Sequence, residues 1–209
     1  MMFVMNSTDD TRSRLILAAR DLMARRNYAD TGVAEICDYA GVGKSSFYHF
    51  FPSKRDLTLA VMDNQFASFK SGLVDQVIAE SLPPLQRLTR LGELMYQFQK
   101  SLAEDIGHVP GCPFGSLAAE VSTMDERIRE SLVLIFKRIE EFFLLTLKEA
   151  QSQGLVGEVD INATAKAMLA YIEGVMLLAK NSNNVEIIRD LFPVVADIRV
   201  PAKQSRNRK

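Results

Sequence analysis

The stretch that decides the fold is TGVAEICDYAGVGKSSFYHFFPSKRDL, residues 31–57. Its apolar residues recur at helical spacing in two short segments, one on each side of the turn Gly41–Gly43. Thr31 is placed as the N-cap of the first segment. Pro52 ends the second segment, because proline disfavours helix in the residue before it. Two short helices joined by a three-residue turn with glycine are typical of a helix-turn-helix.

The side chains of this stretch divide into a packing set and a polar set. The packing set is expected to hold the two short helices against each other and against a first helix over residues 10–26. Its members are Val33, Ile36, Ala40, Val42 and Phe47. The polar set belongs to the second short helix and comprises Lys44, Ser45, Ser46, Tyr48 and His49. Small hydroxyls near a helix N-terminus can approach bases closely, and longer donors can reach phosphate oxygens.

The order of the motif elements resembles the TetR/AcrR family of bacterial repressors. A threonine stands at the helix start, Ala-Gly-Val in the turn, Phe-Tyr-His in the second short helix and Phe-Pro-Ser-Lys after it. The resemblance implies that the residues contacting phosphates are Thr31, Tyr48, His49 and Lys54. It also implies that the residues nearest the bases of a double-stranded operator DNA are Lys44, Ser45 and Ser46.

Helical periodicity continues through the rest of the chain, and no run shows the alternation of a strand. Ser53 and Asp56 form a variant capping box at the start of the next helix. Further helices are expected over residues 53–78, 84–105, from 114, 125–153, 161–181 and 184–192. The sequence therefore predicts an all-α protein.

The predicted organisation has two domains and a tail. Residues 1–52 are expected to form the three-helix helix-turn-helix DNA-binding domain. Residues 53–200 are expected to form a larger helical domain for effector binding and dimerisation. Residues 201–209 are expected to form a basic, disordered tail. The net charge is +1 over residues 1–56, −6 over residues 57–202 and +4 after them. A polyanion prefers the ends of this chain to its middle.

The resemblance implies that the C-terminal helices bind a small-molecule effector and that the last two long helices form a homodimer. A dimer would present two recognition helices to the two halves of a pseudo-palindrome. The helix over residues 125–153 carries a broad apolar stripe of Ile128, Leu132, Ile135, Ile139, Phe142 and Phe143. The helix over residues 161–181 has a small-residue face of Ala163, Ala167, Ala170, Gly174 and Val175. The alternative interpretation of both faces is the core of a single chain.

Candidate walls of an effector pocket are Phe66, Phe69, Met95, Tyr96, Phe98 and Phe114. They suggest an apolar or aromatic effector, and their alternative interpretation is plain core. Cys112 joins this set, just before a predicted helix. A thiol at a helix N-terminus is activated toward electrophiles and oxidants, so a thiol-sensing repressor is an alternative function. The other interpretation of Cys112 is a small buried hydrophobe.

Other classes of protein find less support in the sequence. Cys37 and Cys112 are too few for a disulfide framework or a zinc site, and no metal or other cofactor is expected. No base and orienting group stand at a recognisable catalytic spacing, so an enzyme is not expected. No membrane-spanning or export segment is recognised, which predicts a cytoplasmic protein without a membrane partner. A helical adaptor that has lost DNA binding is a further alternative, because Gly43 and Phe50 stand where polar residues are common in the family.

Overall fold

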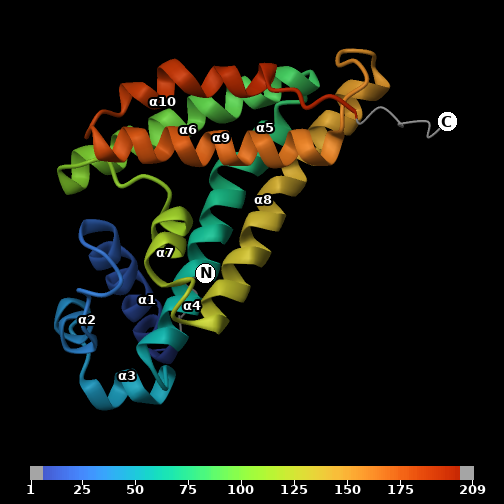
Figure 1. Ribbon diagram of the computed structural model, residues 1–209. Helices are drawn as coiled ribbons and strands as arrows, with labels where there is room; N and C mark the ends of the chain where they lie inside the picture. The colour runs from blue at the N-terminus through green and yellow to red at the C-terminus, as the bar shows by residue number, and fades with distance from the viewer. Residues whose placement is uncertain (1–6, 203–209) are drawn as a thin grey trace, which may run out of the picture. The chain divides into compact units, whose positions relative to one another are not determined.

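The computed structural model describes residues 7–202, with side chains from residue 10 onward, and it is built from helices (Figure 1). Between residues 7 and 202 no β-strand occurs, and one isolated bridge joins Val159 to Pro201. The predicted all-α fold is confirmed. Most of the predicted basic tail, residues 203–209, lies outside the described residues.

The helices follow the order expected from the sequence. The first half of the chain contains α1 Ser7–Arg25, α2 Val33–Ala40, α3 Lys44–Phe50, α4 Lys54–Phe69, α5 Asp75–Ala79 and α6 Pro84–Ile106. The second half contains α7 Pro113–Val121, α8 Glu126–Ser152, α9 Ile161–Asn181, α10 Glu186–Leu191 and a 3-10 helix, η2, Phe192–Asp197. The helix predicted over residues 53–78 has one interruption, a π-helical turn η1 over Lys70–Val74 that separates α4 from α5.

The N-terminal ends of α2 and α4 test the two predicted N-caps, Thr31 and Ser53. Thr31 is not the N-cap of α2, because the helix begins at Val33 and Gly32 occupies the cap position without a side-chain hydrogen bond. Ser53 does cap α4, since its Oγ accepts the backbone N–H of Asp56 at 3.2 Å. The same hydroxyl donates to Asp56 Oδ2 at 2.6 Å, so the two side chains bond to each other instead of forming the reciprocal backbone bond of a capping box.

The chain divides into two compact units. The first contains the described residues up to Phe69 together with Pro113–Val133, and the second contains Lys70–Cys112 and the described residues from Leu134 onward. This division by packing differs from the predicted domain boundary at residue 52. The reason is that α4 packs against α1 and that α7 and the first turns of α8 bond to the same unit.

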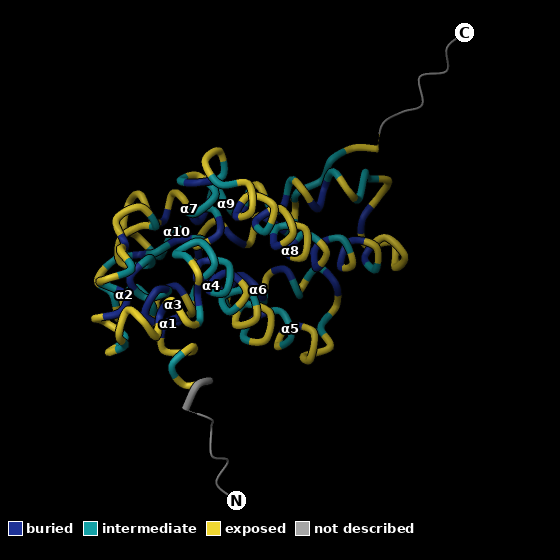
Figure 2. The backbone as a smooth tube through the Cα atoms, turned by 90° about the horizontal axis from the view of Figure 1, so that it is seen from below, coloured by how far each residue is buried: buried dark blue, intermediate teal, exposed yellow. Residues whose placement is uncertain are grey.

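The core of the first unit joins the helix-turn-helix to α1 and α4. Figure 2 shows buried and exposed residues alternating along these helices. The buried members are Leu15, Ile16, Ala18, Ala19, Leu22, Ile36, Cys37, Phe47, Phe51, Leu57 and Val61. Val33, Ala40 and Val42 pack against them while partly exposed. The predicted packing set is therefore confirmed, and it packs α2 and α3 against one hydrophobic core.

The second unit packs α6, α9, α10 and η2 together, and Figure 1 shows α6, α9 and α10 running side by side. Gly92 of α6 lies at a close approach to η2. A Cβ atom at this position would come within 2.5 Å of the ring of the buried Phe192, so a side chain here would force the ring to move. The absence of a side chain on Gly92 lets α6 and η2 pack at this distance.

By length and composition alone, helix α9 is long and apolar enough to cross a membrane. The core helix of a soluble protein passes the same test. Along α9, Ala165, Met168, Val175, Met176 and Ala179 are buried within the unit. A weak compositional signal of this kind is no indication of a membrane protein.

Candidate nucleic-acid interface

Helix α3 presents a run of polar side chains to solvent. All five members of the predicted polar set are exposed, Tyr48 to 56%. In the described part of the chain none of them has a hydrogen-bond or ion-pair partner; they are Lys44, Ser45, Ser46, Tyr48 and His49. Donors of this kind can bind phosphates and base edges without first breaking a bond inside the protein.

Two features fix the orientation of α3. Phe47 is fully buried, so the opposite side of this seven-residue helix is turned to solvent. In the turn before it, Gly41 adopts the left-handed conformation with φ +62°, which favours glycine. Arg14 of α1 donates to the carbonyls of Ala40 and Gly41, the latter at 3.0 Å. The turn is therefore tied to α1 as well as to the apolar core.

Thr31 occupies a different environment from the residues of α3. Its side chain is fully buried, and its Oγ1 donates to the backbone carbonyl of Asn27 at 2.7 Å. In this structure the hydroxyl thus stabilises the loop between α1 and α2. A phosphate contact by Thr31 would require this side chain to become exposed.

Lys54 is also bonded inside the protein. Its Nζ donates to the carbonyl of Tyr28 at 2.6 Å and lies 4.1 Å from the centre of the Tyr28 ring. Burial lowers the pKa of the Lys54 ammonium, while the carboxylates of Glu120 and Asp30 act in the opposite direction. The charge of Lys54 is directed toward the α1–α2 loop.

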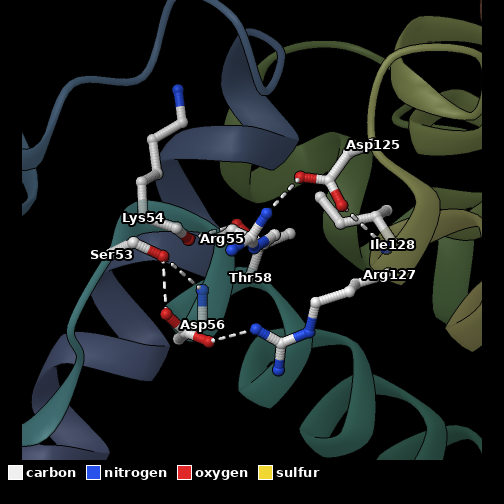
Figure 3. A network of polar contacts seen from close by, with 8 residues as sticks. All are labelled: Ser53, Lys54, Arg55, Asp56, Thr58, Asp125, Arg127 and Ile128. Atoms are coloured by element: carbon white, nitrogen blue, oxygen red, sulfur yellow. Dashed lines mark hydrogen bonds and ion pairs between the residues drawn. The ribbon is translucent and has the colours of Figure 1, made fainter.

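The first turn of α4 is linked by ion pairs to the start of α8, as Figure 3 shows. Arg55 pairs with Asp125 at 3.4 Å, and Asp56 pairs with Arg127 at 3.1 Å. Asp125 also caps α8, because its Oδ1 accepts the N–H of Ile128 at 3.1 Å. The hydrogen bond from Ser53 lowers the pKa of Asp56, and Arg127 adds to this effect. The network fastens α8 to the helix that follows α3.

The predicted effector residues are distributed over both units. In the first unit, the rings of Phe66 and Phe69 lie 6.4 Å apart and are half-buried, and Phe114 is buried on α7. The second unit holds the other four: Met95 is almost fully buried and Phe98 is 47% exposed. The remaining two are Tyr96 and Cys112.

Tyr96 and Cys112 have polar partners within the second unit. The hydroxyl of Tyr96 donates to Glu186 Oε1 at 2.9 Å. The thiol of half-buried Cys112 is hydrogen-bonded to Glu173 of α9. Burial raises the pKa of Glu173, whereas the bond from Cys112 lowers it. A carboxyl group and a thiol therefore meet between α9 and the loop before α7.

The apolar stripe predicted for a dimer interface on α8 has another role. All six of its residues, Ile128, Leu132, Ile135, Ile139, Phe142 and Phe143, are buried within the single chain. Their assignment to a subunit interface was wrong, because side chains already enclosed by one chain cannot be covered by a second. The large apolar residues that are exposed on the second-unit part of α8 and on α9 are instead Leu134, Leu145, Leu177 and Leu178.

Two side chains with evident structural roles carry no signal in the sequence. Glu120 of α7 accepts backbone N–H groups from Tyr28, 92 positions away, and from Ala29. Buried Gln99 of α6 donates to the carbonyl of Gly111 at 3.1 Å and accepts its N–H at 3.3 Å. A lone Glu or Gln on a helix gives no hint of a partner so distant in the chain. In the residues whose side chains are described, no group of three or more potential metal ligands is found.

Comparison with known proteins gives two consecutive matches along the chain. Residues 15–61 match the family described as "Bacterial regulatory proteins, tetR family", and residues 84–191 match the "Tetracyclin repressor-like, C-terminal domain". The first segment includes α2 and α3, and the second extends from α6 through α10.

Individual relatives extend over most of the chain. The transcriptional regulator AcuR of Cereibacter sphaeroides is 32% identical over 79% of this chain and 74% of that protein. The transcriptional repressor DhaR of a Mycobacterium species is 24% identical over 93% of this chain and 94% of that protein. The crystal structure of a regulatory protein TetR from Rhodobacter sphaeroides, 28% identical, has a TM-score of 0.77 and covers 90% of this chain and 98% of its own.

Proposed function

Because the chain belongs to the TetR family and is a DNA-binding transcriptional regulator, we propose that it is a repressor released by a small molecule. It binds a pseudo-palindromic operator as a homodimer, and the effector binds to its C-terminal helices. The observation that carries the proposal is the run of exposed, unbonded donors on α3.

The DNA contacts are divided between α3 and its surroundings. Lys44, Ser45 and Ser46 stand at the N-terminal end of α3 and reach the base edges, while Tyr48 and His49 bind phosphates. Thr31 and Lys54 are phosphate contacts by family resemblance only, since their side chains are bonded within the protein. The motif Phe-Tyr-His therefore supports the function more directly than the flanking Thr31 and Lys54.

The homodimer forms through the exposed apolar residues of α8 and α9. Leu134 and Leu145 lie eleven residues apart on α8, and this spacing brings them onto one face. On α9, Leu177 and Leu178 continue a face whose earlier members are small: Ala163, Ala167, Ala170 and Gly174. Small residues permit close approach of helices, and burial of the exposed part of each leucine contributes on the order of 1 kcal/mol. A second copy of the chain covers this surface.

The effector is a small molecule bound among the C-terminal helices. Its candidate contacts within the second unit are Met95, Tyr96, Phe98 and Cys112, whereas the candidates Phe66, Phe69 and Phe114 belong to the first unit. Within the second unit, the Cys112–Glu173 pair adds a polar group beside the apolar residues of α6 and α9. Ligand and operator prefer different states of one dimer, so each weakens the binding of the other by the same factor.

A thiol-sensing mechanism is the second candidate, and the observation that bears on it is the partner of Cys112. The thiol of Cys112 is hydrogen-bonded to the carboxyl group of Glu173, and thiols that react with electrophiles usually stand beside positive groups instead. This geometry supports a role in effector contact better than a role as a reactive sensor. Thiol-reactive compounds should therefore release wild-type protein and the Cys112→Ser variant from DNA to the same extent.

No catalytic activity and no cofactor belong to the proposed function. Its relatives are transcriptional regulators, and its partners are operator DNA, the effector and a second copy of the chain. The site of action is the cytoplasm, where the chromosome of a bacterium lies.

Selection of genomic fragments by the purified protein, followed by sequencing, tests the proposal. Enrichment of a pseudo-palindrome, with affinity that falls steeply as salt rises, is expected for a dimeric DNA-binding protein. The genes beside the site then indicate the chemistry of the effector. Absence of enrichment at low salt would contradict the proposal and leave the helical adaptor as the better description.

A further inference from the structure

The loop between α1 and α2 is held by side chains from two other helices of its own unit. Glu120 of α7 accepts hydrogen bonds from two successive backbone amides, that of Tyr28 at 2.9 Å and that of Ala29. Lys54 of α4 donates to the carbonyl of Tyr28 at 2.6 Å. The peptide group between Tyr28 and Ala29 is thus bonded at both ends, with Lys54 on its oxygen and Glu120 on its nitrogen.

The rest of the loop is bonded within itself, so it moves as one body with the start of α2. The side chain of Asn27 accepts the N–H of Asp30 at 2.7 Å and donates to its carboxylate at 2.6 Å. Thr31 bonds back to Asn27 through its hydroxyl and to Tyr28 through its N–H. A displacement of the Tyr28–Ala29 peptide is therefore passed to Gly32, the N-cap residue of α2.

Removing the charge of Glu120 should change DNA affinity in opposite directions through electrostatics and through the hydrogen bonds to the loop. A carboxylate in the DNA-binding unit repels phosphates, so electrostatics alone predicts tighter DNA binding when Glu120 is neutralised. Hydrogen bonds to a carboxylate are stronger than neutral ones, so geometry predicts that the loop loosens and DNA binding weakens.

We propose that Glu120 is a positioning residue for operator binding. With Lys54 it fixes the α1–α2 loop, and through the loop it fixes the orientation of α2 and α3 in which the exposed donors of α3 fit the groove. The inference rests on the DNA binding of this chain and assigns no DNA contact to Glu120. Its loss lowers the fraction of molecules in the competent orientation, and the apparent Kd rises as that fraction falls.

The variant Glu120→Gln tests the proposal in the full-length protein. Glutamine is of the same size, but its amide carries one acceptor oxygen, and its NH2 group would face the second backbone N–H. We expect operator affinity to fall about tenfold, which corresponds to a fall of the competent fraction to about a tenth. Amide hydrogen exchange over residues 27–31 should become faster.

The matched control is Glu130→Gln, which removes the same charge from an exposed position of α8 in the same unit. This control should bind the operator as the wild type does or slightly more tightly. Both variants are assayed well below their midpoints of thermal unfolding. If Glu120→Gln does not fold, Glu120→Asp, which keeps the charge on a shorter side chain, takes its place with the same expected direction.

Two results would overturn the proposal. One is operator binding by the Glu120 variant that equals or exceeds that of the Glu130 variant. The other is unchanged amide exchange at residues 27–31 together with weakened binding. Failure of the wild type and of Glu130→Gln to bind the operator would contradict the proposed DNA-binding function. Normal binding by these two proteins and by the Glu120 variant would contradict only the positioning role of Glu120.

Discussion

Helix α3 and the α1–α2 loop both belong to the motif that identifies the helix-turn-helix, yet their polar side chains are placed in opposite ways. On α3, Tyr48 and its neighbours are exposed and unbonded in the described part of the chain. In the loop, Thr31 is buried, and Lys54 bonds to the Tyr28 carbonyl. One motif therefore contains both exposed donors, which we propose as the DNA contacts, and side chains that are bonded within the protein.

The largest effect on DNA binding is expected from α3. The double variant Lys44→Ala/Tyr48→Phe removes one charge and one hydroxyl, neither of which is bonded within the protein. Operator affinity should fall about a hundredfold, or about 2.8 kcal/mol, while the free energy of unfolding changes by less than about 0.5 kcal/mol. Fluorescence anisotropy with labelled operator and urea unfolding measure the two quantities. A large loss of stability would place these side chains with the loop residues instead.

Thr31→Val should show the reverse pattern. Valine keeps the shape of threonine but cannot donate to the Asn27 carbonyl, so the free energy of unfolding should fall by about 1–2 kcal/mol. Operator affinity below the unfolding transition should stay within about threefold of wild type. Equal stability combined with much weaker binding would mean that the Thr31 hydroxyl contacts a phosphate after all.

Lys54→Met distinguishes an internal bond from a phosphate contact by its salt dependence. If Lys54 holds the loop, affinity should fall about fivefold while the slope of log K against log salt stays unchanged. If Lys54 contacts a phosphate, the slope should decrease in magnitude by about 0.9 per subunit, or about 1.8 for the dimer. Titrations at four or more salt concentrations decide between these two results.

The smallest effect concerns the first turn of α4. Ser53 and Arg127 lower the pKa of Asp56, so the stability that its carboxylate contributes is present above the unfolded pKa and lost as pH falls through the folded pKa. The free energies of unfolding of wild type and Asp56→Asn should differ by a few tenths of a kcal/mol at pH 7, since the pair is partly exposed. The difference should vanish in acid. A difference that persists at low pH would show that the carboxylate charge is not its source.

The local pattern of the sequence was sufficient for most of the fold. Helical spacing located the helices to within a few residues, and the order of motif elements located α3 and its exposed donors. Within the motif, the sequence did not separate Thr31 and Lys54 from the residues of α3. The burial and hydrogen bonding of Thr31 and Lys54 depend on their contacts with Asn27 and Tyr28. The helical period of the sequence carries no information about these contacts.

For the apolar stripe of α8, the helical period predicted the spacing of the residues correctly. The prediction that a second subunit covers them was wrong. The stripe from Ile128 to Phe143 is apolar on a helical period, and this property is the same for a subunit interface and for a core. The tertiary structure buries the stripe within one chain and leaves Leu145 and Leu178 exposed. A helix with apolar residues on two faces does not reveal in its sequence which face its own chain covers.

The sequence by itself determined the all-α architecture, the helix-turn-helix and the polar set of α3, because these depend on local spacing and on residues adjacent in the chain. Only the tertiary structure decided three long-range contacts. Glu120 accepts backbone N–H groups of Tyr28 and Ala29, Gln99 hydrogen-bonds to the backbone of Gly111, and Cys112 hydrogen-bonds to Glu173. Each of these contacts joins groups far apart in sequence whose residue types are ordinary. Their pairing arises from the packing of whole helices, which no short stretch of sequence specifies.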